Sequence, residues 1–454
     1  MMFGVPTDRL AVRRLQPELF ALTILALITR FWGLFSPREV VWDEVHYERF
    51  AGAYFTGKYY LDVHPPLGKL MFAAIAKLMG VSGAVLAKVQ PTPSLRVLPA
   101  LAGTLVIPVV YLLLRELGSG RRTATFGAML LLVDNAILVE SRFIWPDMVL
   151  LFFGMFAVLA YALARHSSGS ARWMWIAAAA AACGVAVSIK WTGLSALGLI
   201  GVVWALESWR DRGSGRGRIL GEAALLAVIP SMIYVGAFAV HFALLPYGSQ
   251  TQAHPSFVKS FISLNQQMQG ANAAMATDTH PGASKWYTWP IAKHGIGYWQ
   301  QTDAAAGTER WIMLIANPFI WWGALFGAAA VIVALVRKAK ALEPRRQVLT
   351  VLGAGYLCNF LPFALIPRPM FLYHYLFALT YSVLFVAVGI GALAGWDGDD
   401  SAFWIFPSAK SRRVFVGIAC ATTAMFLYLI PLAYGLPLSE AGLAHRRWIL
   451  ERHG

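Results

Sequence analysis

The chain has 454 residues, of which 58% are hydrophobic and only 13% are charged, and its mean hydropathy is +0.58. This composition excludes an ordinary soluble domain, whose apolar share is nearer half, and predicts a polytopic membrane protein. The formal net charge is +15, but the lysines and arginines lie in short clusters between apolar runs, which is typical of topogenic loops and argues against nucleic acid as a partner.

Eleven membrane-spanning helices are predicted when each apolar run is compared with the roughly 20 residues that a helix needs to cross the hydrocarbon core. The first extends over residues 17–35, and the basic tail before it (Arg9, Arg13 and Arg14) places the N-terminus in the cytoplasm. Arg96 begins the second span. Pairs of spans are expected in residues 123–164, 173–206 and 347–393, and single spans in residues 219–245, 311–336 and 414–431.

The C-terminal tail, residues 434–454, leaves one alternative to this count. If the basic clusters between the spans all face the cytoplasm, the tail lies outside, where positive charge is unusual. It nevertheless carries four basic residues, which are His445, Arg446, Arg447 and Arg452. Either the tail lies flat on lipid headgroups, or the last segment does not cross and the chain has ten spans. We expect eleven spans and an outer C-terminus.

The predicted first outer loop, residues 36–95, concentrates polar chemistry in a chain that has little of it. Two amphipathic pieces within it, residues 44–55 and 67–78, are expected to form helices along the membrane interface. Acids and histidines gathered beside a membrane indicate a reactive site, a binding site or a water-filled cavity. The loop holds six of them within residues 43–64: Asp43, Glu44, His46, Glu48, Asp62 and His64.

Other unusual polar residues fall at outer helix ends, which predicts a site built from several short outer turns. They include Arg96, Glu140, Arg142, Asp147, Lys190, Arg368 and His374. The sequence shows no Gly-rich phosphate loop and no Gly fingerprint after a strand. Any activated donor used at this site is therefore expected to be a lipid rather than a cytoplasmic nucleotide sugar.

Six segments, in chain order and over most of the chain, carry a family resemblance. They are WDEVHYERFAGAYFTGKYYLDVHPPLGKLMFA, LRVLPALAGTLVIPVVYLLLRELG, LLVDNAILVESRFIWPDMVLLFF, IKWTGL, NPFIWW and FLYHYLFAL. Together they resemble the signatures of protein O-mannosyltransferases in their bacterial form. The resemblance implies an all-α polytopic fold of the GT-C glycosyltransferase type, as one transmembrane domain over residues 1–454.

The same resemblance implies an activity and a location. Mannose would pass from polyprenyl-phosphate-mannose to Ser or Thr hydroxyls of exported proteins, with inversion at the sugar carbon, at a site facing outside the bacterial plasma membrane. Eukaryotic members carry a β-trefoil domain in the outer loop between spans seven and eight, but here that loop, residues 246–310, is too short for one. Its aromatic and histidine residues, around His254 and Trp286, predict a partial lid over the site.

The two acids of the Asp-Glu motif, Asp43 and Glu44, are the predicted catalytic pair. A Ser or Thr hydroxyl is a poor nucleophile near neutral pH and needs a base to take its proton. In the resembling family the first acid has this role, which assigns it to Asp43. Glu44, one residue on, points elsewhere and is expected to orient the acceptor. The alternative is that both acids merely favour the start of a helix.

A departing phosphate needs fixed cations, and Arg and Lys side chains suit its oxygens. Arg96 matches an arginine that the resembling family uses for function. The residues predicted to bind the donor phosphate or lipid are Arg96, Arg142, Lys190, Arg368, Tyr373 and His374. The alternative for the cations is an interfacial position with the charge reaching lipid headgroups, and for Tyr373 and His374 an aromatic belt.

Four further residues are predicted to contact the acceptor or shape the site. His64 precedes two prolines that form a rigid corner, which is expected to aim His64 or Asp62 at the site, unless the corner is only a bend. His46 lies one helical turn after the Asp-Glu pair. Asp147 follows Pro146, so helix capping competes with a role in the site.

No cofactor is expected to be required. Asp43, His46 and His64 could form a metal site, but a monophosphate leaving group held by arginines needs a divalent ion less. The cysteines lie within apolar runs and predict neither disulfides nor zinc binding; they are Cys183, Cys358 and Cys420.

Two other functions remain open at this point. A related enzyme could transfer the sugar to a lipid or glycan, and nothing in the sequence excludes it. A transporter or flippase would be expected to show repeated halves and mid-membrane charges, and neither is evident. If the site faces outward, acceptors are expected to arrive during export, with the export machinery as a candidate partner.

Overall fold

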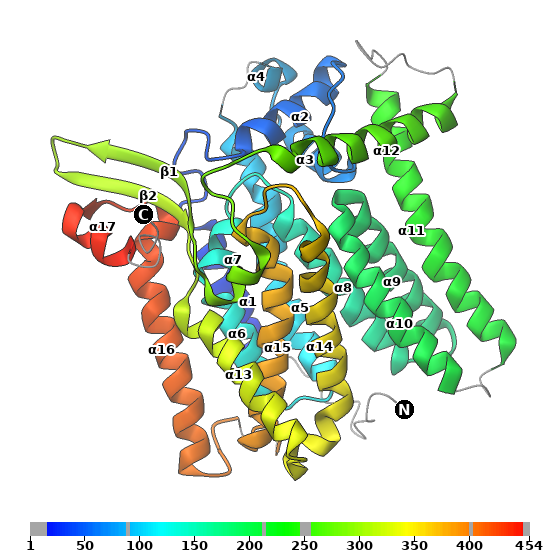
Figure 1. Ribbon diagram of the computed structural model, residues 1–454, viewed down its shortest axis with the longest axis vertical. Helices are drawn as coiled ribbons and strands as arrows, with labels where there is room; N and C mark the ends of the chain where they lie inside the picture. Colours follow the sequence, from blue (N-terminus) through cyan, green and yellow to red (C-terminus); the bar gives the residue numbers. More distant parts are fainter. Residues whose placement is uncertain (1–15, 88–90, 211–214, 246–255, 399–402, 448–454) are drawn as a thin grey trace.

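The computed structural model describes residues 16–87, 91–210, 215–245, 256–398 and 403–447 (Figure 1). His254 and the arginines of the N-terminal tail lie outside these residues. The three cysteines are free.

Nine helices within the described residues are long and apolar enough to cross a membrane when each is taken with its adjoining 3-10 turns. They form where the sequence supplies the apolar length that a bilayer requires. Their bounds are α5 (Val97–Glu116), α8 (Asp147–Arg165), α9 (Gly169–Ile189), α10 (Leu194–Arg210), α11 (Arg216–Leu244), α13 (Pro318–Val336), α14 (Arg346–Phe360), α15 (Leu376–Leu393) and α16 (Ala409–Tyr434).

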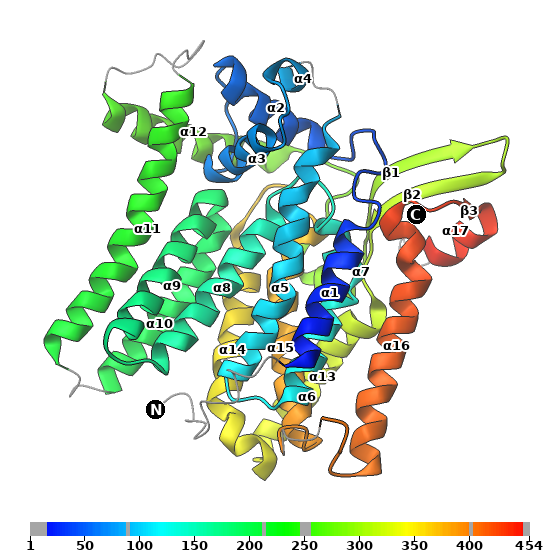
Figure 2. The ribbon, with the colours of Figure 1, turned by 180° about the vertical axis from the view of Figure 1, so that it is seen from behind.

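Two shorter helical segments complete the bundle. Helix α1 (Pro17–Phe31) packs along α5, and α6 (Arg121–Leu132), followed by α7 (Asn135–Glu140), lies between α5 and α15 (Figure 2). They lie where the sequence predicts two further spans, but among the described residues only the nine longer helices have the length and composition to cross a membrane. The last helix, α17 (Glu440–Arg447), lies at the same end of the bundle as the first loop, whereas α1 begins at the opposite end (Figure 2).

The first loop forms the two predicted amphipathic helices and a third short one. These are α2 (Glu44–Thr56), α3 (Leu67–Leu78) and α4 (Gly83–Ala87), which lie over one end of the bundle (Figure 1). Helix α2 ends at Gly57, whose φ of 70° is the left-handed conformation that glycine adopts at helix C-termini. The helices bury a small apolar core of their own, which includes Ala51, Tyr54 and Phe72.

The loop before α13 folds into structure that the apolar pattern did not predict. Helix α12 (Phe257–Ala274) leads to strands β1 (Ile296–Asp303) and β2 (Thr308–Leu314), and β3 (Leu438–Ser439) joins them in an antiparallel sheet of order β1-β2-β3. The span expected from residue 311 therefore begins later, at Pro318. Residues 311–314 pair in the sheet instead, and Pro318 occupies the first helical turn, where proline is well tolerated.

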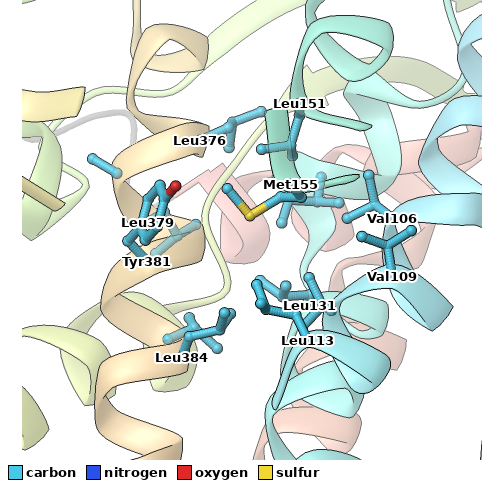
Figure 3. Close-up of a cluster of buried hydrophobic side chains, with 14 of the residues drawn as sticks. Val106, Val109, Leu113, Leu131, Leu151, Met155, Leu376, Leu379, Tyr381 and Leu384 are labelled. Atoms are coloured by element: carbon cyan, nitrogen blue, oxygen red, sulfur yellow. The ribbon is translucent and has the colours of Figure 1, made fainter. Parts of the chain in front are cut away.

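The main core lies between α5, α6, α8 and α15, where apolar side chains from helices far apart in sequence meet (Figure 3). The close-up shows Val106, Val109 and Leu113 of α5 near Met155 of α8, with Leu131, Leu376, Leu379 and Leu384 around them. Gly103 lets α5 approach the connection between α7 and α8, because a Cβ there would lie 2.1 Å from Ser141 Oγ. The bundle thus holds that connection firmly at the end where α2 and α3 lie.

Candidate functional site

A cavity of about 320 Å³ opens at the end of the bundle covered by α2 and α3. Nine of the twelve predicted site residues line it, namely Asp43, His46, Asp62, His64, Asp147, Lys190, Arg368, Tyr373 and His374. They come from the start of α2, the loop before α3, the first residue of α8, the turn after α9 and the segment before α15. Short turns at one end of the bundle therefore converge on one cavity.

Asp43 occupies the N-cap position of α2, but its side chain does not cap the helix. Its carboxylate has no hydrogen-bond partner within the described part of the chain. Burial raises the pKa of Asp43, although the charges of His46, Lys190 and His280 oppose the shift. A partly buried carboxylate with free oxygens is suited to accept a proton from a substrate hydroxyl.

Trp42, the residue before Asp43, is held in position by backbone and ring contacts. Its φ of 47° lies in the left-handed region that side chains seldom adopt, and such strain is often found at functional sites. The backbone N–H of Trp42 donates to the Tyr298 carbonyl at 3.2 Å, and its ring contacts those of Tyr298 and His280 at 5.3 and 5.2 Å. The loop of residues 256–314 thus contributes Met275 and Tyr298 to the cavity lining. Trp286, around which a partial lid was predicted, is not part of this lining and packs on Phe360 instead.

Lys190 and Asp147 form an ion pair within the cavity. Lys190 follows α9, and its Nζ donates to both carboxylate oxygens of Asp147 at 2.8 Å. The same ammonium lies 5.5 Å from the centre of the Tyr373 ring. Arg368, which is half-buried, has no hydrogen bond or ion pair to any other described residue. One paired and one unpaired cation thus face the same space.

A second cavity, of about 430 Å³, adjoins the first and is mostly apolar. The two share Asp147, Tyr373 and His374, and the second extends between α8, α10, α14 and α15 along Leu150, Leu151, Leu194, Ile366, Leu376 and Phe377. A polar cavity that borders an apolar one between helices can accommodate a ligand with a charged head and a hydrocarbon chain.

Glu44 and Arg96 lie outside the lining of the polar cavity. They form an ion pair at 2.7 Å and are 1% and 0% exposed. The Glu44 carboxylate also accepts from the backbone N–H groups of Val41 and Ile144 at 2.9 and 3.0 Å. The remaining Arg96 N–H groups donate to backbone carbonyls of the first loop, including that of Pro37 at 2.6 Å. In this geometry both residues stabilise the first loop. It does not support the predicted contact of Glu44 with the acceptor or that of Arg96 with the donor phosphate.

Arg142 is also turned away from the cavity. Its guanidinium donates to the carbonyls of Arg30, Trp32 and Gly33 at 2.7–3.1 Å and lies 4.2 Å from the centre of the Tyr434 ring. A cation that satisfies the last carbonyls of a helix stabilises its C-terminus. Arg142 thereby ties α1 and α16 to the connection after α7 and is not placed to bind a donor phosphate in this structure.

The corner at residues 62–66 is held by Lys69, which the sequence reading did not single out. Lys69 forms an ion pair with Asp62 and donates to the His64 carbonyl at 2.6 Å. Burial disfavours the charged form of Asp62, but the ion pair with Lys69 outweighs it and holds the pKa of Asp62 below the ordinary value. Burial also lowers the pKa of His64, and Lys190 adds to that effect. His64 is therefore neutral at neutral pH.

Glu140, Trp145 and Tyr298 also line the cavity. From sequence, Glu140 was counted among the polar residues of the site but given no role, and Trp145 and Tyr298 were not assigned to it. Tyr298 lies on β1, and its hydroxyl donates to Glu140 Oε1 at 2.6 Å. Glu140 stands out in the sequence as an acid at an outer helix end, whereas an isolated tyrosine in a distant loop gives no such signal. Among the residues that the structure describes, no group of three or more His, Cys, Asp or Glu side chains is arranged to hold a metal ion.

Two family models match this chain. The model described as dolichyl-phosphate-mannose-protein mannosyltransferase matches residues 20–246, and that of the C-terminal four TMM region of protein-O-mannosyltransferase matches residues 257–452. The chain belongs to the protein O-mannosyltransferase family. This confirms the resemblance to protein O-mannosyltransferases, whereas the bacterial form stays a prediction.

Curated members of this family match about half of the chain. Protein O-mannosyl-transferase 1 of Danio rerio is 33% identical over 245 residues, which cover 50% of this chain and 34% of that protein. Dolichyl-phosphate-mannose--protein mannosyltransferase 4 of Schizosaccharomyces pombe is 36% identical over 213 residues, which cover 44% of this chain and 27% of that protein. The chain thus spans about a third of the length of the curated relatives that it matches.

Solved structures of mannosyltransferase family members and related enzymes share the fold. The S. cerevisiae Pmt1-Pmt2 complex bound to the sugar donor gives a TM-score of 0.85 at 17% identity, covering 98% of this chain and 94% of that one. ArnT from Cupriavidus metallidurans bound to undecaprenyl phosphate gives 0.55 at 19% identity, covering 95% and 77%. These matches confirm the predicted GT-C fold.

Proposed function

We propose that this protein transfers mannose from a polyprenyl-phosphate-mannose donor to Ser or Thr hydroxyls of proteins. Membership of the family, whose matching model names dolichyl-phosphate-mannose, supports the donor and the reaction. The observation that carries the proposal is the polar cavity itself. It is lined by the free carboxylate of Asp43 and by the cations Lys190 and Arg368, and it borders an apolar cavity suited to a prenyl chain.

The proposed reaction is a single displacement at the anomeric carbon. The acceptor oxygen forms the new bond to that carbon while the bond to the phosphate oxygen breaks, so the configuration inverts. Asp43 takes the hydroxyl proton, and the departing prenyl phosphate keeps the electron pair. Lys190 and Arg368 stabilise the negative charge that develops on the phosphate, which is a major source of catalysis in such transfers. In this proposal the displacement requires no metal ion.

The setting of the reaction is part of the proposal. We propose a bacterial plasma membrane, with the cavity on its outer side, because the basic clusters of the loops favour the cytoplasm for the opposite end. Acceptors would then reach the cavity as they leave the cell, which favours association with the export machinery. Equal modification of fully folded, already exported acceptors would count against delivery during export.

The rate is expected to fall in acid with a midpoint above about 4, the ordinary pKa of an aspartate. Asp43 acts only when ionised, and burial raises its pKa, so protonation begins at a higher pH than for an exposed aspartate. Replacing His46 with Asn removes a charge that favours the ionised form and should move the midpoint further up. The pH dependence of kcat/KM measures this, with His445→Asn on exposed α17 as the control. A midpoint that is below 4 or insensitive to His46 would argue against Asp43 as the base.

Replacing Arg368 with Gln is expected to raise KM for the lipid donor by roughly 10- to 100-fold, the effect of losing a hydrogen bond to a charged group. Arg368 faces the cavity without a protein partner, so its loss should affect the donor rather than the fold. KM for the donor and for the peptide are measured separately. The matched control is Arg310→Gln on the exposed face of β2. A change confined to the peptide KM would reassign Arg368 to the acceptor.

Acceptor class is tested by swapping acceptors with the purified protein. Radiolabelled polyprenyl-phosphate-mannose is supplied with a Ser/Thr-rich peptide, with the same peptide in which Ser and Thr are replaced by Ala, or with lipid and glycan acceptors. Label on the first peptide alone is the expected result. Label on a lipid or glycan but on neither peptide would contradict the protein-acceptor proposal.

A further inference from the structure

The wall segment of residues 140–146, between α7 and α8, holds two buried polar atoms without partners. Oε2 of Glu140 and Nε1 of Trp145 have no hydrogen bond within the described part of the chain, although the two side chains are only 1% and 5% exposed. Both residues line the polar cavity. A buried polar group left unpaired destabilises a protein, so two such groups in one cavity wall need an explanation.

The wall segment is anchored so that these two side chains have little freedom. Ile144 N–H is bonded to Glu44, and Arg142 is bonded to the carbonyls at the end of α1. Tyr298 then fixes the two residues from the other side, because its hydroxyl donates to Glu140 Oε1 and its ring lies 4.9 Å from that of Trp145. The unpaired atoms are therefore preorganised, which is the arrangement expected of groups that receive a ligand.

We propose that Glu140 Oε2 and Trp145 Nε1 recognise hydroxyl groups of the donor's hexose ring, a proposal that rests on the mannosyl transfer proposed above. One atom accepts a hydrogen bond and the other donates one, and a sugar hydroxyl both donates and accepts. The rings of Trp42, Trp145 and Tyr298 provide apolar surface for the C–H face of the ring. Together these residues form a sugar subsite beside Asp43.

This subsite gives a reason for the buried residues that do not reach the cavity. Glu44, Arg96 and Arg142 hold the wall segment and the first loop in position, so that the hydroxyl contacts are made without reorganisation. A site built to hydrogen-bond a substrate hydroxyl rejects an analogue without that hydroxyl, because its own polar groups are then left unpaired. Selectivity among hexoses is thus assigned to the wall segment rather than to Lys190 and Arg368, which are proposed to contact the phosphate.

The test compares polyprenyl-phosphate-mannose with its four monodeoxy analogues, at positions 2, 3, 4 and 6. Both kcat/KM with a Ser/Thr peptide and Kd for the donor are measured for the wild type, Glu140→Gln, Trp145→Phe and Tyr298→Phe. Trp145→Phe keeps the ring and removes only the N–H, and Tyr298→Phe removes only the hydroxyl that holds Glu140. Trp311→Phe is the matched control, since its N–H is bonded to Glu309 on β2, away from the cavity.

In the wild type and in Trp311→Phe, at least one deoxy donor is expected to lose roughly 10- to 100-fold in kcat/KM and in affinity. In each cavity variant the penalty should shrink for the deoxy donor that lacks the hydroxyl contacted by the altered residue, or by Glu140 in the case of Tyr298→Phe, because that contact is already absent or weakened. Variants that weaken mannose and all deoxy donors by one common factor would overturn the subsite and leave only a supporting wall. If the wild type transfers no mannose, the proposed function fails, and the Kd series still decides the subsite.

Discussion

Replacing Asp43 with Asn is expected to lower kcat by roughly 10²- to 10⁴-fold while donor affinity stays within a few-fold of the wild type. General-base catalysis contributes about this factor, and Asn is isosteric but takes no proton. The Asp43 carboxylate has no partner among the described residues, so its replacement removes no protein contact and should not destabilise the fold. Initial rates of peptide mannosylation and donor Kd, measured on the same preparations, separate the two effects.

The control for Asp43 is Asp303→Asn, an exposed acid at the end of β1 on the same side of the bundle. It should transfer at the wild-type rate. Transfer by Asp43→Asn within about threefold of the wild type would leave the family assignment intact and remove Asp43 as the base. Glu140 would then be the next carboxylate in the cavity to consider.

Replacing Glu44 with Ala is expected to destabilise the protein by about 3–5 kcal/mol, because it leaves the Arg96 charge buried without its partner. It also removes the acceptor for the N–H groups of Val41 and Ile144. The yield of folded protein and the melting temperature in detergent should both fall strongly. Glu440→Ala on the exposed start of α17 removes an acid without a buried partner and should melt with the wild type.

Arg96→Lys separates the structural task of Arg96 from its predicted contact with the donor phosphate. Lysine keeps the charge but cannot bond Glu44 through two nitrogens while reaching the loop carbonyls. The expected result is a lower melting temperature with an unchanged donor KM in the protein that remains folded. An unchanged melting temperature with a raised donor KM would instead support the phosphate contact.

The sequence indicated the passes of the bundle and most of the cavity lining because both depend on local patterns. Apolar runs of sufficient length predicted the spans. Polar residues are rare in the chain, so those at helix ends, such as Asp43 and Lys190, were predicted to converge, and both line the polar cavity. The strands were missed because residues 311–314 continue the apolar run of α13, so hydropathy alone could not separate strand from helix. Only the pairing with β1 distinguishes them.

The direction in which a buried side chain points could not be read from the sequence. Arg96 precedes one span and Lys190 follows another, yet Arg96 is enclosed by Glu44 and loop carbonyls, whereas Lys190 reaches the cavity. That difference depends on partners 52 and 43 residues away in sequence. Tyr298 was missed for the same reason, since its partner Glu140 is 158 residues away.

A structure of the protein with polyprenyl-phosphate-mannose bound tests the central claim most directly. The account predicts that the phosphate contacts Lys190 and Arg368, that the prenyl chain follows the apolar cavity, and that the sugar lies between Asp43 and Glu140. A phosphate bound instead at Arg96 or Arg142, or a sugar outside the polar cavity, would contradict it.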